Sequence, residues 1–363
     1  MRTGYANLPL HGGQAPRWLF NRMVKLAREM TIFVVAEHGP DEMLRRLSDP
    51  YWFQAFGCVL GFDWHSSGVT TTVGGAIKEG VKDLQDELGF YVAGGKGATS
   101  RKTPAEIERY CEKCSANASA LAYASRLSAK VDSAAVQDGY QLYHHNFFFV
   151  RSGAWAVVQQ GMNTDNKYAR RYHWLSDMVA EFTCEPHAAV CCDSRGECLN
   201  MVARESAGAR NASTVISREG PDKVTRELNK ISNLTLPRRH EVNLSDVSGR
   251  HFHKILVSTY EKQPADFEAL LAMPGVGPKT IRALSLVAEL VYGEQPSFRD
   301  PARFSFAHGG KDGYPYPVDR TTYDQTIEVL EKCIRKGKID LSERTAALRR
   351  LRDFANQGSG VKR

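Results

Sequence analysis

The sequence predicts a mixed α/β amino-terminal domain at residues 1–235, followed by an all-helical carboxy-terminal domain at residues 236–363. Strand-length runs of aromatic and β-branched residues occur in the first part, whereas apolar residues at helical spacing dominate the second. A polar segment at residues 208–243, rich in Arg, Ser and Asn, lies between them and is typical of a linker. These three observations place the domain boundary inside that segment.

Helices are expected in the first domain where apolar residues recur every three or four positions. Glycine and proline mark their ends, as Gly89 does for the third of them. The fourth begins with a capping box, in which Thr103 and Glu106 would satisfy free amides of the first turn. The four segments are Pro16 to about Thr31, a short helix after Pro40, Val73 to Leu88, and Ile107 to about Ala116.

Two segments rich in aromatic and β-branched residues, 140–150 and 155–160, are separated by Arg151-Ser152-Gly153 and predict a β-hairpin. Two further short strands are expected at residues 187–192 and 198–203. A loop rich in Gly, Pro and Tyr is expected at residues 293–317, with helices after it at about 323–336 and 342–354.

The most informative stretch is LAMPGVGPKT, at residues 271–280. It predicts a helix-hairpin-helix, in which a glycine turn joins two helices and Pro278 begins the second, since its missing N–H would be unpaired there. Unpaired amides at a helix start bind phosphate, and glycines let a backbone approach closely. An ordinary helical corner is the alternative. The expected DNA contacts are Gly275, Val276, Gly277, Lys279 and Thr280.

Composition excludes few classes of protein. A total of 48 Lys and Arg against 41 Asp and Glu gives a net charge of +7, which permits an anionic partner without requiring one. The chain has no long apolar run free of charges and no apolar secretory segment at its start, so no membrane association is expected. Eight cysteines in 363 residues do not indicate a disulfide scaffold, and a cytoplasmic location is expected.

Long motifs cover most of the chain, among them LPLHGGQAPRWLF, GFDWHSSGVTTTVGGAIKEG, DGYQLYHH, MPGVGPKTIRALSLVAELVYG and FAHGGKDGYPYPVD. They resemble a bacterial and archaeal family called domain of unknown function 763. The resemblance implies little chemistry, because no settled activity is known for that family.

The hairpin also resembles that of DNA glycosylases of the helix-hairpin-helix superfamily, in which a Val-Asp element begins a later helix. Val318-Asp319 matches that element. The resemblance implies that the Lys279 amine would be the nucleophile and Asp319 the catalytic carboxylate. Two features depart from those enzymes: a long insertion precedes Asp319, and only Cys333 lies beyond the hairpin, where many of them bind an iron–sulfur cluster through four cysteines. Phosphate contact by Lys279 and helix capping by Asp319 are the alternatives.

Three other segments are candidates for contact with nucleic acid. In the inserted loop, glycines surround His308, which could transfer a proton, and Lys311, which could bind phosphate. Residues 94–101 could also cradle a phosphate, although they lack the spacing of a nucleotide triphosphatase loop. Arg170 and Arg171 form a third candidate surface. Ordinary surface turns are the alternative for both loops.

A candidate metal centre combines Asp63, His65, Asp138 and His144, since carboxylate and imidazole ligands suit a divalent metal ion in a nuclease. In a strand, His144 and His145 would point to opposite faces, so only one of them can enter such a site. Packed, hydrogen-bonded histidines are the alternative.

Three functions are consistent with these patterns. The leading hypothesis is a DNA-processing or repair enzyme that holds the sugar–phosphate backbone through the hairpin, with base excision by Lys279 and Asp319 as its chemistry. A metal-dependent nuclease centred on Asp63, His65 and His144 is the first alternative. A DNA-binding adaptor without catalysis is the second. A divalent metal ion is the one cofactor that the sequence suggests.

Overall fold

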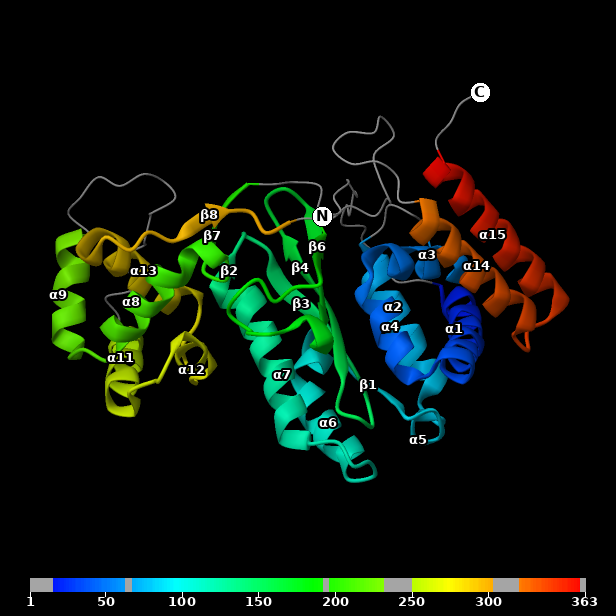
Figure 1. The fold of residues 1–363 in the computed structure, drawn as a ribbon, viewed down its shortest axis with the longest axis horizontal. Coiled ribbons are helices and arrows are strands. Elements are labelled where there is room, and N and C mark those ends of the chain that lie inside the picture. Colours follow the sequence, from blue (N-terminus) through cyan, green and yellow to red (C-terminus); the bar gives the residue numbers. More distant parts are fainter. Residues whose placement is uncertain (1–15, 63–66, 192–195, 232–249, 303–319, 360–363) are drawn as a thin grey trace.

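The structure, a computed structural model, describes residues 16–62, 67–191, 196–231, 250–302 and 320–359. Its elements form three groups along the long axis of the molecule (Figure 1). A sheet with two helices against it lies in the middle, and a helical group lies at each end. The mixed α/β class and the presence of carboxy-terminal helices are confirmed, but residues 236–363 are not all helical, because a short strand at Ser297–Arg299 belongs to the smaller of two sheets.

The central sheet has five antiparallel strands in the order β1-β3-β4-β5-β6. They are β1 Phe90–Lys96, β3 Gln141–Val150, β4 Trp155–Asn163, β5 Tyr168–Leu175 and β6 Ala189–Cys191. A smaller sheet joins β2 Val136–Gln137, β7 Glu197–Asn200 and β8 Ser297–Arg299. The predicted β-hairpin is therefore confirmed as β3 and β4, and the two predicted short strands as β6 and β7.

One face of the sheet packs against helices from both ends of the chain, with Phe148 and Val158 in the core between them. Helix α14 packs against α1, and α15 packs against α3, where the rings of Tyr51 and Phe354 lie 5.2 Å apart. The last two helices thus complete the amino-terminal layer. The helices on this face are α1 Arg17–His38, α2 Pro40–Ser48, α3 Pro50–Leu60, α4 Gly68–Val81, α5 Gln85–Leu88, α14 Arg320–Lys336 and α15 Leu341–Ser359.

The opposite face directs Phe147 and Phe149 into a second core. Two helices, α6 Thr103–Cys111 and α7 Ala118–Lys130, cover it, and a π-helical turn, η2 Val131–Ala135, continues α7. A 3-10 helix, η1 Gly97–Lys102, connects β1 to α6. A second helical group, at the end of the molecule away from α1, packs against α7 and η2. It comprises α8 Ala207–Ser217, α9 Pro221–Ile231, α11 Arg250–Lys262, α12 Phe267–Ala272 and α13 Pro278–Tyr292.

The segment 208–243, expected to be a polar linker, instead contains helices α8 and α9. Helix α9 buries Val224, Leu228 and Ile231 on one stripe, while most of its other positions are polar or charged. The segment has a low average hydrophobicity because α9 is amphipathic, with its few apolar residues all on one face. Both helices pack against α13. The boundary expected at residues 235–236 lies outside the described residues.

The capping box predicted for α6 does not form. Thr103 lies inside the helix, and its hydroxyl donates to the carbonyl oxygen of Ser100 over 2.6 Å. Glu106 instead accepts hydrogen bonds from the Lys78 ammonium and from the backbone N–H of Gly94, each over 2.7 Å. A charge-assisted contact with a partly buried ammonium is stronger than a neutral cap, so the tertiary contact determines where this carboxylate lies.

The docking of α15 gives a testable prediction. Phe354 is 4% exposed, whereas Leu341 on the same helix is 76% exposed. We expect Phe354→Ala to lower the free energy of unfolding by about 3–5 kcal/mol through lost burial and the cavity left behind. Leu341→Ala should change it by less than about 0.5 kcal/mol. Urea denaturation followed by circular dichroism measures both, and equal small losses would contradict this docking.

Candidate functional site

Helices α12 and α13 meet at a tight turn, which we call the α12–α13 corner (residues 273–280). Gly275 has a φ of +86°, a backbone conformation that glycine adopts without strain. Val276 and Thr280 are buried, whereas Gly275, Pro278 and Lys279 are exposed. The corner thus has an inner side anchored in the second core and an outer side open to solvent.

Lys130, the last residue of α7, holds the inner side of the corner. Its ammonium donates hydrogen bonds to the carbonyl oxygen of Val276 and, over 3.4 Å, to that of Met273. In a trans peptide the N–H that follows a carbonyl points the opposite way. The N–H of Gly277 therefore points away from Lys130 and toward the outer side. Tyr123 and Glu268 add a second tie between α7 and α12, with a hydrogen bond of 2.7 Å.

Donors on the outer side of the corner have no partner within the described part of the chain. No described residue accepts a hydrogen bond from the backbone N–H of Gly275 or Gly277. Gly277 precedes the proline that begins α13, so these groups include the unpaired donors of a helix start. Such donors bind an anionic oxygen well, because the helix dipole adds to the hydrogen bonds.

A cavity of about 480 Å³ lies beside the corner, between α7, η1 and β3. Ala272, at the end of α12, lines it on the side of the corner. Arg101, Arg126 and Lys130 contribute positive charge to its lining, and no carboxylate is among its described lining residues. We call this the α7 cavity. Its charge suits an anionic ligand.

The basic residues around the α7 cavity are not neutralised by the described part of the chain. Among the described residues, none of Arg101, Arg126 and Lys130 forms an ion pair with a carboxylate. Lys96, at the end of β1, places its ammonium 5.9 Å from the centre of the Tyr143 ring, and Tyr143 lines the cavity. The α7 cavity borders the α12–α13 corner, because its lining includes Ala272 and Lys130, and both are candidate contacts for a negatively charged polymer.

Residues 94–101, expected as a phosphate-binding loop, are only partly suited to that role. The N–H of Gly94 is already bonded to Glu106, and its carbonyl oxygen accepts from Lys78 over 2.7 Å. What this segment contributes to the α7 cavity is the side chains of Ser100 and Arg101.

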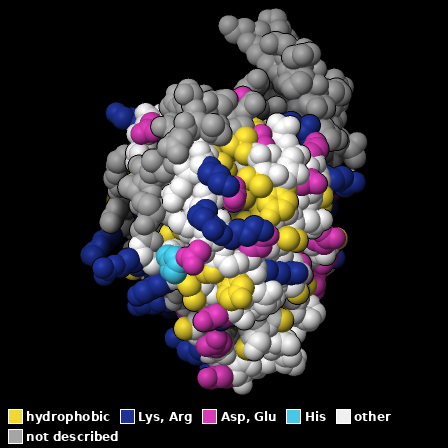
Figure 2. All heavy atoms as spheres, turned by 90° about the vertical axis from the view of Figure 1, so that its left-hand side faces the viewer, with side chains coloured by type: hydrophobic (Ala, Val, Ile, Leu, Met, Phe, Trp, Pro, Cys, Tyr) yellow, Lys and Arg dark blue, Asp and Glu magenta, His cyan; other side chains and the backbone are white. Residues whose placement is uncertain are grey.

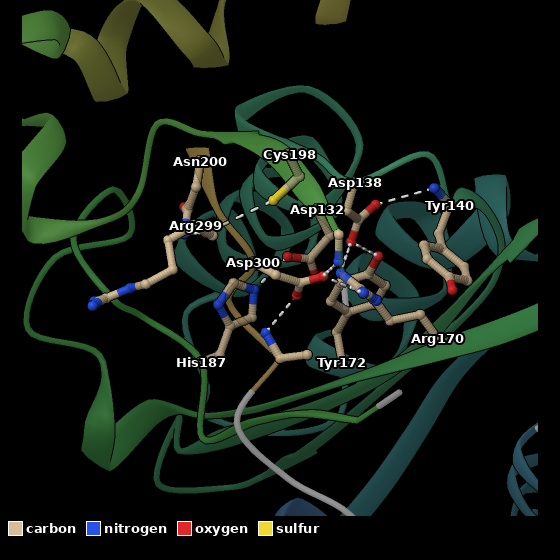
Figure 3. A network of polar contacts seen from close by, with 12 residues as sticks. Asp132, Asp138, Tyr140, Arg170, Tyr172, His187, Cys198, Asn200, Arg299 and Asp300 are labelled. Carbon is tan, nitrogen blue, oxygen red and sulfur yellow. Dashed lines mark hydrogen bonds and ion pairs between the residues drawn. The ribbon is translucent and has the colours of Figure 1, made fainter. Parts of the chain in front are cut away.

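Arg170 and Arg171, expected on a nucleic-acid surface, are buried in β5, with exposed fractions of 1% and 0%. Arg170 donates to Asp138 and Asp300 over 2.8 Å each, and it lies between these two carboxylates in Figure 3. Arg171 donates to the side-chain oxygen of Gln54 over 2.8 Å. That prediction is wrong, because two adjacent arginines of a central strand point into the protein on opposite faces of the sheet.

Asp138 and His144, the two predicted metal ligands that the structure describes, do not form a metal site. Asp138 accepts from Arg170, from the Tyr172 hydroxyl over 2.7 Å and from the backbone N–H of Tyr140 over 3.1 Å, so its oxygens are already occupied (Figure 3). His144 is buried on the face toward α4, and neither ring nitrogen has a described hydrogen-bond partner. Within the described ranges, no three His, Cys, Asp or Glu side chains are grouped as metal ligands.

The expectation that His144 and His145 face opposite ways is confirmed. His144 lies against Gly74 of α4, whereas His145 contacts Ser125 of α7 with 2.9 Å between Nε2 and Oγ. Ser125 and His145 line the α7 cavity. Sequence inspection missed this pair, since α7 itself was not predicted.

Lys279, the predicted nucleophile, is described and exposed. The corner therefore gives its amine no buried environment of the kind that activates a lysine nucleophile.

The other residues predicted for the glycosylase and metal sites and for the inserted loop include several that the structure does not describe. The residues outside the described ranges are Asp63, His65, His308, Lys311 and Asp319.

Comparison with known proteins places the chain in a family. A family model described as "Protein of unknown function (DUF763)" matches residues 4–318, so the chain belongs to that family, as its motifs predict. No curated protein and no solved structure matches the chain. Among the described helices, none is long and apolar enough to cross a membrane.

The buried histidines predict how stability depends on pH. Burial lowers the pKa of His144 to about 3 and also lowers the pKa of His145 and His173. In the unfolded chain an imidazole takes up its proton near pH 6.5, whereas the folded protein does not. The free energy of unfolding should therefore fall as the pH drops below about 6.5, by up to about 1.4 kcal/mol per pH unit for each such histidine.

Urea denaturation at a series of pH values between 7 and 5 measures this slope. His38→Gln, at an exposed position, should leave the slope unchanged. A free energy of unfolding that stays constant over this range would show that these imidazoles are not buried in the neutral form.

Proposed function

We propose that the protein binds the sugar–phosphate backbone of DNA through the α12–α13 corner, which resembles a helix-hairpin-helix. The observation that carries the proposal is the contact between Lys130 and the carbonyl oxygen of Val276. This contact turns the N–H of Gly277 outward, where a phosphate oxygen can accept from it. The exposed Lys279 lies two residues further along the chain and adds a positive charge.

The α7 cavity extends this contact surface beyond the corner. A strand whose phosphate is held at Gly277 would pass Arg126 and Arg101, the basic residues of the cavity lining without a described carboxylate partner. Contacts of this kind position a protein on DNA without reading base sequence. We therefore propose binding without strong sequence preference.

A broad basic face is not what supports this proposal. Figure 2 shows the end of the molecule on the left of Figure 1, and basic and acidic side chains are interspersed over it. The net charge of +7 is likewise modest for 363 residues. Support comes instead from the directed amides of the corner and from Arg101 and Arg126 of the cavity lining, for which the described part of the chain provides no carboxylate partner.

Base excision by Lys279 and Asp319 stays a prediction, as does a metal-dependent nuclease using Asp63 and His65. No described contact favours either activity. Borohydride trapping of an adduct with abasic DNA, lost in Lys279→Ala, would support the first. Cleavage of plain DNA that a chelator stops and His65→Ala removes would support the second.

Gly277 offers a direct test of DNA binding. Its φ of −141° is open to any residue, and an added Cβ would lie 3.9 Å from its nearest neighbour, so substitutions there should fold. Glutamate would place a carboxylate beside the phosphate site. We expect Gly277→Glu to weaken binding of a short DNA duplex by about 10- to 100-fold, the contribution of one charge-assisted hydrogen bond. Fluorescence anisotropy measures the Kd.

Gly220 provides a matched control. It also precedes a proline that begins a helix, Pro221 of α9, and nothing lies within 4 Å of its Cβ position. Gly220→Glu adds the same charge and should leave the Kd within about 3-fold. Raising the salt concentration should weaken wild-type binding steeply, because phosphate contacts release counterions. Equal affinities of wild type and Gly277→Glu would overturn the assignment of the corner.

A further inference from the structure

A chain of hydrogen bonds leads from the interior of the sheet into the α7 cavity. Ser125 Oγ lies 2.9 Å from His145 Nε2, and His145 Nδ1 lies 2.7 Å from the side-chain oxygen of Gln159. The Gln159 amide nitrogen donates to the backbone oxygen of Ser128 over 3.1 Å and to the Asp132 carboxylate. Ser125 and His145 line the cavity, whereas Gln159 and Asp132 are fully buried behind them.

The acceptors around Gln159 fix the protonation of His145. The Ser128 carbonyl and the Asp132 carboxylate can only accept, so the amide nitrogen of Gln159 must face them and its oxygen must face His145. The proton of the neutral imidazole therefore sits on Nδ1. Nε2 then carries a lone pair, and the Ser125 hydroxyl donates its proton to it. A serine bonded to a base that a third group orients is the arrangement of an activated nucleophile.

Asp132 is itself held firmly. It belongs to the π-helical turn η2, and π-helical turns are frequent at functional sites. Its carboxylate accepts from the Trp174 indole over 3.0 Å and contacts His187, which Figure 3 shows beside it. A fixed negative charge behind Gln159 favours the imidazolium that forms when His145 takes a proton.

We propose that Ser125 is a nucleophile and His145 its general base in a site that cleaves a phosphodiester bound in the α7 cavity. The nucleophile is inferred from the hydrogen-bond chain alone, and the choice of a nucleic-acid strand as substrate rests on the proposed DNA binding. Arg101, Arg126 and Lys130 supply the positive charge that an anionic diester requires. Tyr123 and Tyr143 in the lining offer aromatic surface for a nucleobase.

The reaction balances with water as the one co-reactant. His145 Nε2 accepts the Ser125 proton while Ser125 Oγ forms a bond to phosphorus, and the P–O bond to one ester group breaks. That leaving alkoxide takes the proton from His145, which leaves a phosphodiester on Ser125. Water, deprotonated by His145, then attacks the same phosphorus. The Ser125 oxygen leaves and regains the proton, and a phosphate monoester is released.

The test uses the full chain with bis(p-nitrophenyl) phosphate, a small anionic diester that does not need the corner for binding. We expect a burst of one p-nitrophenolate per protein molecule, followed by slower turnover. Acid quenching and peptide mass mapping should find the p-nitrophenyl phosphoryl group on Ser125. No adduct in the wild type, or an adduct on another residue, would overturn the proposal.

Two buried serines form a matched pair of variants, Ser125 of α7 and Ser217 of α8. Ser125→Ala should lower the hydrolysis rate at least about 100-fold and abolish the adduct. Ser217→Ala removes a buried hydroxyl that donates to the backbone oxygen of Thr214 over 2.7 Å, outside the lining of the α7 cavity, and should retain the rate within about 3-fold. Hydrolysis that survives Ser125→Ala, or that a chelator abolishes, would overturn the proposal.

Gln159 acts as a positioning residue. Gln159→Met should lower kcat by about 10-fold or more with KM little changed, because the substrate still binds while the imidazole loses its fixed tautomer. A purely structural role would change stability and leave kcat of the folded protein unaltered. Because the small diester does not need the corner, wild-type protein that hydrolyses it without binding DNA would show a failure of the DNA-binding proposal and not of this nucleophile.

Discussion

The contact of Lys130 with the α12–α13 corner determines most of what this surface can do. A partly buried ammonium must find acceptors, and among the described residues it finds backbone carbonyls rather than a carboxylate. Burial lowers the pKa of the Lys130 ammonium. The contact also joins helix α7, which covers the sheet, to the group of helices that contains α12 and α13. Because the carbonyls are used inward, the amide of Gly277 is presented outward. The same side chain borders the α7 cavity, so the corner and the cavity share one wall.

Strand periodicity explains why neighbouring residues have unrelated roles. In β3, His144 lies toward α4 and His145 toward α7, and only His145 joins the chain that reaches Ser125. In β5, Arg170 binds Asp138 and Asp300, and so links the central sheet to the segment that follows β8. Arg170, which on a surface would indicate a binding face, here stabilises the junction of two sheets.

Local chemistry made part of this fold predictable. The glycine–proline pattern of residues 274–278 and the turn between β3 and β4 specify their own geometry, so both were found from sequence. Helix α3 is buried on every side and has no periodicity to detect, and α7 is rich in alanine and serine, which carry little pattern. The Ser125–His145 contact joins a helix and a strand 20 residues apart, and no spacing rule encodes such a contact. Burial of Arg170 likewise depends on tertiary packing.

Amide hydrogen exchange at Gly277, followed by nuclear magnetic resonance, tests the central claim most directly. If the amide points outward and is unpaired, it should exchange rapidly in the free protein and become protected when a DNA duplex is added. Amides in the middle of α13 should stay protected throughout. A Gly277 amide that is already protected in the free protein, or whose exchange DNA does not change, would contradict the account.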